Sequence, residues 1–212
     1  MSALQRQALE GNDDPSDSGC LQELVMNVVD KAARLAMVAH NGTNRDGEGN
    51  VPYIVHPHAV VAMLKEWGFT EKANPVTLAV AWCHDVLEDT ATPEGAILDL
   101  DVELGTQILS GVRRLTFKPN VPHGSADYGR LKADYIAAVA RMAPPEILAV
   151  KIADRLCNTL DFLADGRPAK ALEYFGYGAP LFARIPVCAH ARSIEKSRKQ
   201  TLLWLAVANG TV

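Results

Sequence analysis

The sequence contains few aromatic residues, which make up 6% of the chain against 48% for all hydrophobic residues. Its apolar content consists mostly of Ala, Leu and Val, spread through long segments in which β-branched residues seldom alternate with polar ones. This composition favours helices over sheets, because Ala and Leu lose little conformational freedom in a helix. The apolar runs fall well short of the roughly 18 residues that a membrane span needs, so we expect a soluble protein.

The chain also lacks the features of nucleic-acid-binding and secreted proteins. The formal charge is −4 and the isoelectric point is about 5.9, and no block of Lys and Arg could follow a phosphate backbone. No nucleic-acid partner is therefore expected. The four cysteines, at positions 20, 83, 157 and 188, show no C-x-x-C spacing, and no secretory leader opens the chain. These absences indicate reduced thiols and a cytoplasmic location.

The length of the chain limits its domain organisation. A chain of 212 residues is long enough for one sizeable core and too short for two ordinary domains with linkers. Residues 1–19 are polar and rich in turn-forming residues, so we expect a disordered lead-in there. Residues 20–212 are expected to form a single domain.

Helical periodicity runs through that expected domain. Apolar residues recur at spacings of three and four over residues 20–40, which predicts an amphipathic helix that starts near Ser18. A second helix is predicted over residues 53–67, ending at a left-handed Gly68, and a strongly apolar third over residues 76–89. Further helices are predicted near residues 97–98, over 104–115, 128–142 and 144–163, and two or three over 169–208, broken near Gly176, Gly178 and Pro186. With no repeat and no convincing strand, the sequence predicts an all-α helical bundle.

An acidic cluster at the end of the predicted third helix is the most informative feature. His84, Asp85, Glu88 and Asp89 close an otherwise apolar segment, and on one continuous helix they would share a polar face. Burying three carboxylates beside an imidazole is costly unless a cation neutralises them. A solvated helix end is the ordinary alternative for acidic residues. The adjacent His84 and Asp85 favour a site, because both side chains can bind one divalent ion.

A second candidate lies in the apolar segment at residues 148–156, which contains Asp154. A carboxylate in such surroundings needs a partner. An ion pair with Lys151 or Arg155 is one interpretation, and a metal ion is another. Asn158 lies one turn after Asp154 on the same predicted helix face and could bond a ligand.

A third candidate is His56, which precedes Pro57 at the start of the predicted second helix. Taken alone, such a histidine more often has a structural role. Together with the two other clusters it completes a set of two imidazoles and two carboxylates, which suits manganese, iron, zinc or magnesium. This candidate ligand set is His56, His84, Asp85 and Asp154.

Three stretches together resemble the motifs of RelA/SpoT-type HD hydrolases: residues 53–57 (YIVHP), 84–90 (HDVLEDT) and 150–158 (VKIADRLCN). They occur in the family's order, and the similarity spans about residues 24–163. The resemblance implies an HD-type helical bundle that uses one manganese ion. It also implies hydrolysis of the 3′-diphosphate of the nucleotides ppGpp and pppGpp, with release of pyrophosphate.

The resemblance further implies roles for individual residues. Glu88 and Asp89 match the acidic pair that orients or deprotonates the attacking water. Asn158 matches a nucleotide-binding amide, and Arg45 lies in a stretch similar to the family's basic loop. Lys151 is a candidate phosphate contact. The residues that match the family's metal ligands are His56, His84, Asp85 and Asp154.

The sequence departs from the family pattern at three points. Cys157 stands where the long bifunctional enzymes have histidine, and the loop between Arg45 and Tyr53 is longer than usual. The chain also has no room for a synthetase domain. The resemblance therefore implies hydrolysis alone.

Other sites find less support in the sequence. A zinc–thiolate site at Cys83 and Cys157 is disfavoured, because Cys83 should point away from the face of His84 and buried inert thiols are commoner. No G-x-S-x-G or G-x-x-x-x-G-K-[ST] motif supports a serine nucleophile or a P-loop nucleotidase. Surface or capping roles suffice for the other histidines, which are His40, His58, His123 and His190.

Two alternative functions stay open. One is an HD hydrolase that acts on another nucleotide, and the other is a helical module that keeps a metal for sensing or scaffolding. The presence of both Glu88 and Asp89 favours an enzyme, because a module that only binds a ligand does not need two extra acids beside the metal. Apolar helices near the C-terminus would permit a homodimer.

Overall fold

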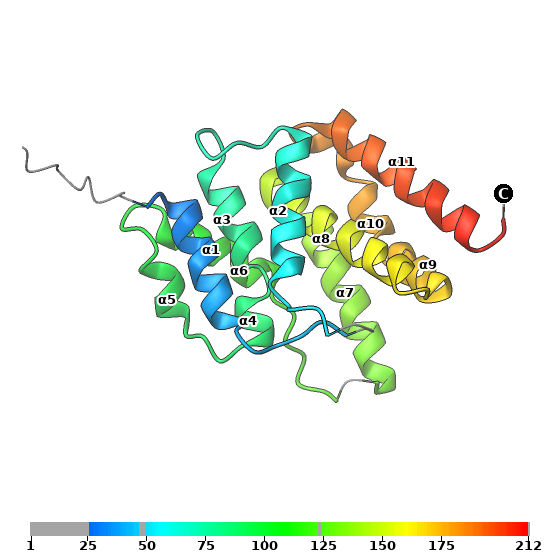
Figure 1. The fold of residues 1–212 in the computed structure, drawn as a ribbon, viewed down its shortest axis with the longest axis horizontal. Coiled ribbons are helices and arrows are strands. Elements are labelled where there is room, and N and C mark those ends of the chain that lie inside the picture. The colour runs from blue at the N-terminus through cyan, green and yellow to red at the C-terminus, as the bar shows by residue number, and fades with distance from the viewer. Residues whose placement is uncertain (1–25, 47–49, 123, 212) are drawn as a thin grey trace, which may run out of the picture.

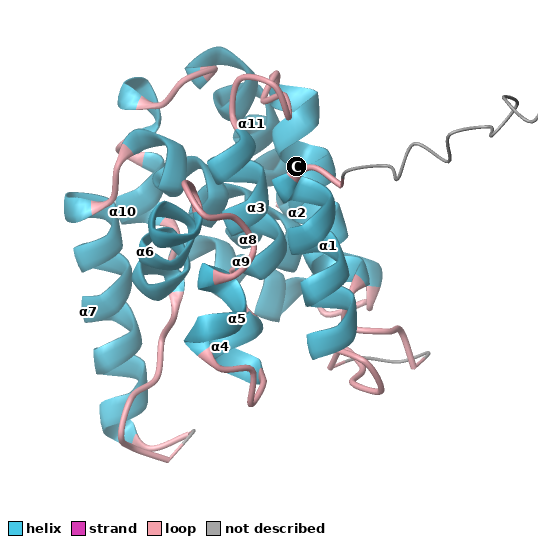
Figure 2. Cartoon of the chain, turned by 90° about the vertical axis from the view of Figure 1, so that its left-hand side faces the viewer, coloured by secondary structure: helices cyan, strands magenta, loops and turns pink. Residues whose placement is uncertain are grey.

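The computed structural model describes residues 26–46, 50–122 and 124–211, and the one strand-like pairing among these residues is an antiparallel bridge between Asn44 and Pro52. The predicted all-α, single-domain bundle is confirmed (Figures 1 and 2). The predicted lead-in at residues 1–19 lies outside the described residues. The helices are α1 (Val28–Ala39), α2 (Val55–Trp67), α3 (Pro75–Cys83), α4 (Val86–Asp89), α5 (Glu94–Leu98), α6 (Gly105–Leu115), α7 (Ala126–Met142), α8 (Pro145–Ala164), α9 (Pro168–Gly176), α10 (Ala179–Phe182), the 3₁₀ helix η2 (Ile185–Val187) and α11 (Ala191–Ala208).

Helix α8 lies at the centre of the bundle, where it packs against α2, α3, α9, α10 and α11 (Figure 1). Pro145 occupies its first turn, where a missing N–H costs nothing. Residues 147–157 are all buried, which explains why this segment is apolar on most sides. Three of these buried residues, Lys151, Asp154 and Arg155, are charged. Because buried charges need partners, these residues mark the place to look for a site.

Helix α1 begins later than the sequence predicts. Asn27 caps it, with an extended backbone and a side-chain oxygen that accepts hydrogen bonds from the amides of Val29 and Asp30. The predicted start near Ser18 is therefore wrong, and the helix begins at Val28. The apolar spacing extends further upstream in the sequence, but periodicity alone does not reveal at which residue a capping side chain starts a helix.

The predicted helix over residues 76–89 is interrupted, because His84 and Asp85 separate α3 from α4. The Nδ1 atom of His84 lies 2.7 Å from the carbonyl oxygen of Ala81. In a continuous helix, the amide of Asp85 would use that carbonyl, so the histidine ring competes with the backbone. The continuous helix predicted there is therefore wrong, because both residues lie on a turn between two helices, although Asp85, Glu88 and Asp89 still line one cavity.

Two glycines matter for the packing. Gly68 ends α2 with a φ of +109°, which confirms the left-handed ending predicted from the sequence. Gly111 on α6 lies so close to α3 and α8 that a Cβ would be 2.6 Å from Cγ2 of Val80 and 3.0 Å from Cδ1 of Ile147. The close approach of α6 therefore requires glycine at this position.

The C-terminal segment folds as α9, α10, η2 and α11, with interruptions at residues 177–178, 183–184 and 188–190. The predicted breaks near Gly176, Gly178 and Pro186 are thus confirmed. Helix α11 packs against α2, α8 and α9. Over the residues that the structure describes, no helix combines the length and apolar character needed to pass through a bilayer.

Candidate metal centre

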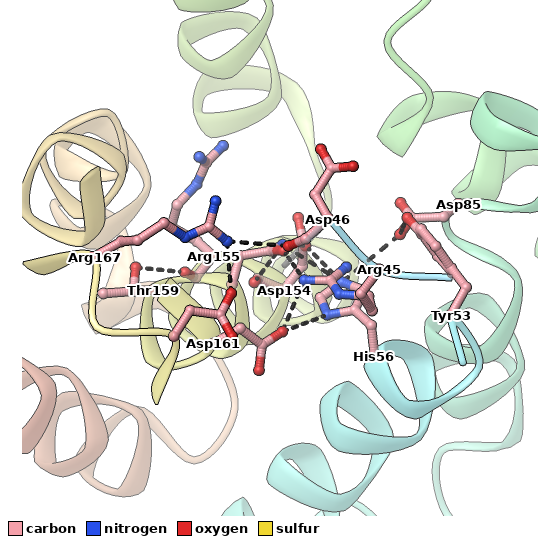
Figure 3. Close-up of polar contacts among 12 residues, drawn as sticks. Arg45, Asp46, Tyr53, His56, Asp85, Asp154, Arg155, Thr159, Asp161 and Arg167 are labelled. Atoms are coloured by element: carbon pink, nitrogen blue, oxygen red, sulfur yellow. Dashed lines mark hydrogen bonds and ion pairs between the residues drawn. The ribbon is translucent and has the colours of Figure 1, made fainter. Parts of the chain in front are cut away.

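Side chains from three distant segments meet at one point of the bundle (Figure 3). His56 lies in the first turn of α2, Asp85 directly before α4, and Asp154 in the middle of α8. His84 lies between α3 and α4, next to Asp85. His56 Nε2 is 3.1 Å from Asp154 Oδ1, and His84 Nε2 is 3.1 Å from Asp85 Oδ2. The cross distances, from His56 Nε2 to Asp85 Oδ2 and from His84 Nε2 to Asp154 Oδ1, are 3.7 and 3.8 Å. The four side chains thus surround one small space.

This donor set fits a divalent cation. His56, His84 and Asp154 are 1%, 0% and 3% exposed. The Nε2 atom of His84 is buried and makes no well-aligned hydrogen bond, although Asp85 Oδ2 lies 3.1 Å away, and a bound cation would give it a partner. Ligand atoms of His56, His84 and Asp85 all lie within 4.8 Å of one another. Two imidazole nitrogens and two carboxylate oxygens are donors that first-row divalent ions accept.

The backbone and the neighbouring charges prepare His84 for such a role. Its contact with the Ala81 carbonyl places a hydrogen on Nδ1, which leaves the Nε2 lone pair facing the carboxylates. Burial lowers the pKa of His84, but the charge of Asp85 and a contact with Asp154 outweigh it and raise the pKa to about 10. A proton and a cation compete for the same lone pair, so metal binding here would release a proton.

The two further acids lie on α4, next to the four side chains. The carboxylate of Glu88 accepts a hydrogen bond of 2.8 Å from the amide of Phe117. Burial raises the pKa of Glu88 to about 7, against the opposing charge of Lys151. Burial and the charge of Asp85 also raise the pKa of Asp89. Glu88 can therefore gain or lose a proton near neutral pH, as a general acid or base must.

Tyr53 and His40 also belong to the site, although the sequence interpretation gave them no part in it. The Tyr53 hydroxyl is 2.8 Å from Asp85 Oδ2 (Figure 3). It also contacts Asp89 Oδ2. The ring of His40 stacks on that of Tyr53, with centroids 4.4 Å apart and planes inclined by 14°. His40 is the C-cap of α1, but its side chain is only 3% exposed, so a surface role is wrong. The signal available in the sequence was the position of Tyr53 three residues before His56.

Arg45 and Asn158 meet at the edge of the centre. Arg45 Nη2 donates to Asn158 Oδ1 at 2.6 Å and to Asp161 Oδ2 at 2.7 Å. Asn158 Nδ2 in turn donates to Asp154 Oδ1 at 2.5 Å. The longer loop after Arg45 therefore does not remove this arginine from the site. Of these two predicted substrate contacts, Asn158 bonds the candidate ligand Asp154 directly, and Arg45 is linked to it through Asn158.

Lys151 is the third predicted substrate contact, and it is engaged within the protein. Its Nζ lies 2.9 Å from Asp154 Oδ2 and 5.5 Å from the centroid of the Tyr135 ring. Burial opposes its charge, but Asp154 holds the pKa of Lys151 well above its usual value. Lys151 is therefore a buried cation beside the metal centre, and a phosphate would have to share it with Asp154.

A second group of cations, which the sequence interpretation missed, completes the site. Arg155 is 1% exposed, its guanidinium lies 3.9 Å from the centroid of the Tyr174 ring, and its Nε and Nη1 atoms have no hydrogen-bond partner. Lys132 on α7 lies 5.7 Å from the same ring, and burial followed by the charges of Arg155 and Lys151 lowers its pKa. A cavity of about 100 Å³ joins these cations to the acids. Its walls include Tyr53, Asp85, Glu88, Asp89, Phe117, Lys132, Tyr135, Lys151, Asp154, Arg155, Asn158 and Tyr174.

The remaining cysteines and histidines lie apart from this chemistry. Cys83 and Cys157 are buried free thiols, and burial raises the pKa of Cys83 to about 12, as expected of inert cysteines. His190 occupies the N-cap position of α11 without a side-chain capping hydrogen bond, and its ring packs on that of Phe69 with centroids 4.9 Å apart. His58 packs near Trp82 with ring centroids 5.8 Å apart. His123 lies outside the described residues.

No family model matches the sequence, but curated proteins do. A GTP pyrophosphokinase of Streptomyces coelicolor is 31% identical over 180 residues, which are 84% of this chain and 19% of that protein. The bifunctional (p)ppGpp synthase/hydrolase RelA of Mycobacterium tuberculosis is 35% identical over 173 residues, 80% of this chain and 22% of that protein. A probable guanosine-3′,5′-bis(diphosphate) 3′-pyrophosphohydrolase of Synechocystis is 29% identical over 189 residues, 86% of this chain and 22% of that protein.

Among solved structures, one described as a metazoan ortholog of SpoT that hydrolyzes ppGpp matches with a TM-score of 0.67 and 19% identity. The match covers 88% of this chain and 98% of that chain. These matches support a RelA/SpoT-type HD domain. The resemblance seen in three short motifs is thereby confirmed. This RelA/SpoT-type domain spans about a fifth of the length of the curated relatives it matches.

Proposed function

We propose that this RelA/SpoT-type domain is a metal-dependent phosphohydrolase that removes the 3′-diphosphate of ppGpp or pppGpp. The oxygen of water would bond to the phosphorus attached to the ribose 3′ oxygen. The bond between that phosphorus and the 3′ oxygen would break, which gives pyrophosphate and GDP or GTP. The observation that carries the proposal is the convergence of His56, His84, Asp85 and Asp154 beside two further acids. Relatives named for (p)ppGpp hydrolysis support the same substrate.

The cation proposed for the centre is Mn²⁺, which the family resemblance favours among the ions that suit this donor set. When bound, a divalent ion lowers the pKa of water and draws charge from a phosphoryl oxygen. The ligands would be His56 and His84 through Nε2, and Asp85 and Asp154 through one carboxylate oxygen each. Lys151 would balance the remaining charge on Asp154.

Glu88 and Asp89 would handle the attacking water. The amide of Phe117 holds Glu88 Oε2, which leaves Oε1 to accept a proton from the water. With a pKa of about 7, the Glu88 carboxylate is basic enough to take that proton and can return it to the leaving 3′ oxygen. Asp89, which Tyr53 contacts through its hydroxyl, would orient the water.

The cations around the cavity would bind the phosphates. A substrate with two diphosphate groups carries several negative charges, and the acids of the metal centre would repel it without compensation. Lys132 and Arg155 are positioned to contact one diphosphate, because both line the cavity and Arg155 has unused donors. Arg45 and Asn158, which are hydrogen-bonded to each other, are proposed to contact the nucleotide.

The proposal is tested with the purified chain, Mn²⁺ and ppGpp, by following pyrophosphate release and Mn²⁺ content. The wild type should release pyrophosphate, and Asp85→Asn and Asp154→Asn should lose both bound Mn²⁺ and turnover. Asp127→Asn is the matched control, because Asp127 lies on the exposed surface of α7 in an ion pair with Arg130, and it should retain both. Glu88→Ala should keep Mn²⁺ and lose rate.

The same assay separates the alternatives when pppGpp, dinucleotides and nucleoside monophosphates are included. Turnover of one of these, with ppGpp left intact, would make the domain an HD hydrolase of another nucleotide. A protein that binds Mn²⁺ but hydrolyses none of them would instead be a metal-binding module.

A further inference from the structure

Tyr53 connects two acids to which the proposed function gives different roles. Its hydroxyl lies 2.8 Å from Asp85 Oδ2 (Figure 3) and also contacts Asp89 Oδ2, a contact made by the same oxygen. A tyrosine hydroxyl carries its hydrogen at neutral pH, so it can donate to a carboxylate. One hydroxyl has a single hydrogen to donate, so the two carboxylates share it and the hydroxyl lies between them.

The position of Tyr53 is set by its own segment and is independent of the acids. Its amide donates to the carbonyl of Thr43 at 2.9 Å, and the amide of Arg45 donates to the carbonyl of Val51 at 2.9 Å. These bonds flank the bridge between Asn44 and Pro52 and make a short antiparallel pairing. The tyrosine therefore approaches Asp89 from a part of the chain that is separate from α4.

Asp89 needs such support from outside. It is the last residue of α4, a helix of four residues, and Thr90 after it has an extended backbone (φ −126°, ψ 170°). The end of so short a helix does not hold a side chain rigidly. A contact from Tyr53 restricts where the carboxylate of Asp89 can lie.

His40 supplies the face against which the tyrosine ring rests. The two rings stack at 4.4 Å with nearly parallel planes, and both nitrogens of His40 are buried without hydrogen-bond partners. Burial lowers the pKa of His40, so the ring is neutral. Among the described residues, the polar atoms of the His40 imidazole bond nothing. The imidazole therefore contributes to the site only through the stacking of its ring face on Tyr53.

We propose that Tyr53 is a positioning residue that holds the Asp89 carboxylate beside the metal-binding carboxylate of Asp85, and that His40 fixes the tyrosine by stacking. The inference rests on the proposed function, since it assigns Asp89 to the attacking water and Asp85 to the metal. It predicts that loss of the hydroxyl affects the reaction step more than metal or substrate binding.

The test removes a single oxygen atom with Tyr53→Phe. We expect kcat to fall roughly 10- to 100-fold, the effect of losing one hydrogen bond to a charged group. KM and the Mn²⁺ affinity measured by calorimetry should each change by less than about threefold, a range equivalent to under 1 kcal/mol. Tyr177→Phe is the matched control, because the exposed Tyr177 also bonds a carboxylate, that of Glu173, away from the site. It should behave as the wild type.

The stacking role is tested at position 40. His40→Ala should lower kcat in the same direction as Tyr53→Phe, and His40→Phe should restore most of it, because phenylalanine keeps the ring face. An equal loss of kcat in His40→Ala and His40→Phe would contradict the stacking role. Thermal unfolding of each variant identifies any that fail to fold, and in that case Tyr53→Phe alone decides the proposal.

A separate measurement distinguishes failure of this inference from failure of the proposed function. If the wild type does not hydrolyse ppGpp, the substrate assignment falls, and crystal structures of the Mn²⁺-loaded wild type and Tyr53→Phe then test the positioning directly. The Asp89 carboxylate should be displaced or disordered in the variant and ordered in the wild type. An unmoved Asp89, or a variant with wild-type kcat, would overturn the inference.

Discussion

Lys151 lies one turn before Asp154 on α8, and its Nζ is 2.9 Å from Asp154 Oδ2. The two side chains are 8% and 5% exposed. The sequence left an ion pair and a metal ion as two interpretations of Asp154, and the geometry accommodates both. Oδ2 faces Lys151, while Oδ1 faces His56. A buried pair of this kind is tolerated only while each charge keeps a partner.

Replacing Lys151 should therefore destabilise the metal-free protein more than the Mn²⁺-loaded one. Lys151→Met leaves Asp154 as a buried, poorly compensated charge, which costs about 3–5 kcal/mol. A bound cation compensates that charge, so Mn²⁺ should recover a large part of the loss in chemical unfolding. Lys65→Met removes an exposed ion pair with Glu71 and should cost less than about 1 kcal/mol with or without Mn²⁺. Equal losses for Lys151→Met in both states would contradict the proposed role.

The raised pKa of Glu88 predicts how the stability of the metal-free protein depends on pH. The pKa is about 7 in the folded protein against an ordinary value of 4.5, so folding favours the protonated form. That stabilisation is fully present below pH 4.5 and is lost as the pH rises through 7. Glu88→Gln cannot ionise, so the wild type should lose on the order of 3 kcal/mol relative to it across this range. The free energy of unfolding is measured for both proteins between pH 4.5 and 8. A constant difference between the two proteins over this range would disprove the shift in the pKa of Glu88.

The close approach of α6 to its neighbours gives a prediction about packing. In Gly111→Ala, the new methyl group would lie 2.6 Å from Val80, so the helices must move apart and the protein should lose about 1–3 kcal/mol. Gly129→Ala is the matched control, because nothing lies within 4 Å of its added Cβ on the exposed side of α7. It should gain up to about 1 kcal/mol from helix propensity. Denaturant unfolding of both variants tests the contrast.

Features set by local sequence were predictable. The glycine that ends α2 and the proline that opens α8 both act within a turn of their own position, so their patterns could be read directly. The break between α3 and α4 was not predictable in this way. It depends on the ring of His84 contacting the carbonyl of Ala81, and periodicity carries no information on such competition.

The site shows the same division. The four candidate ligands stand out because polar residues in apolar segments need partners, and motif order then groups them. Lys132 could not be identified from sequence pattern or motif order, because it lies on α7 and lines the cavity only through tertiary packing. Arg155 was visible, but an arginine next to an aspartate suggested an ion pair. In the structure its guanidinium lies on Tyr174 instead.

Arg155 leads to the last prediction, which concerns substrate binding. Its guanidinium is buried against Tyr174 at 3.9 Å, lines the cavity and leaves Nε and Nη1 without hydrogen bonds. A buried cation with unused donors is suited to a phosphate group. Arg155→Met keeps much of the side-chain volume but removes the donors, so KM for ppGpp should rise roughly 10- to 100-fold. Steady-state kinetics with Mn²⁺ measures this change.

Two comparisons separate phosphate binding by Arg155 from a purely structural role. Mn²⁺ affinity should stay at the wild-type value in Arg155→Met, because Arg155 is not among the candidate metal ligands. A disrupted core would instead weaken both Mn²⁺ binding and ppGpp binding. Arg113→Met removes an exposed arginine that pairs with Glu94 and should leave KM unchanged. Arg155→Lys should recover part of the affinity through its charge, but not all of it, since lysine lacks the planar donors that bind two phosphate oxygens together. An unchanged KM in Arg155→Met would place the diphosphate elsewhere in the cavity.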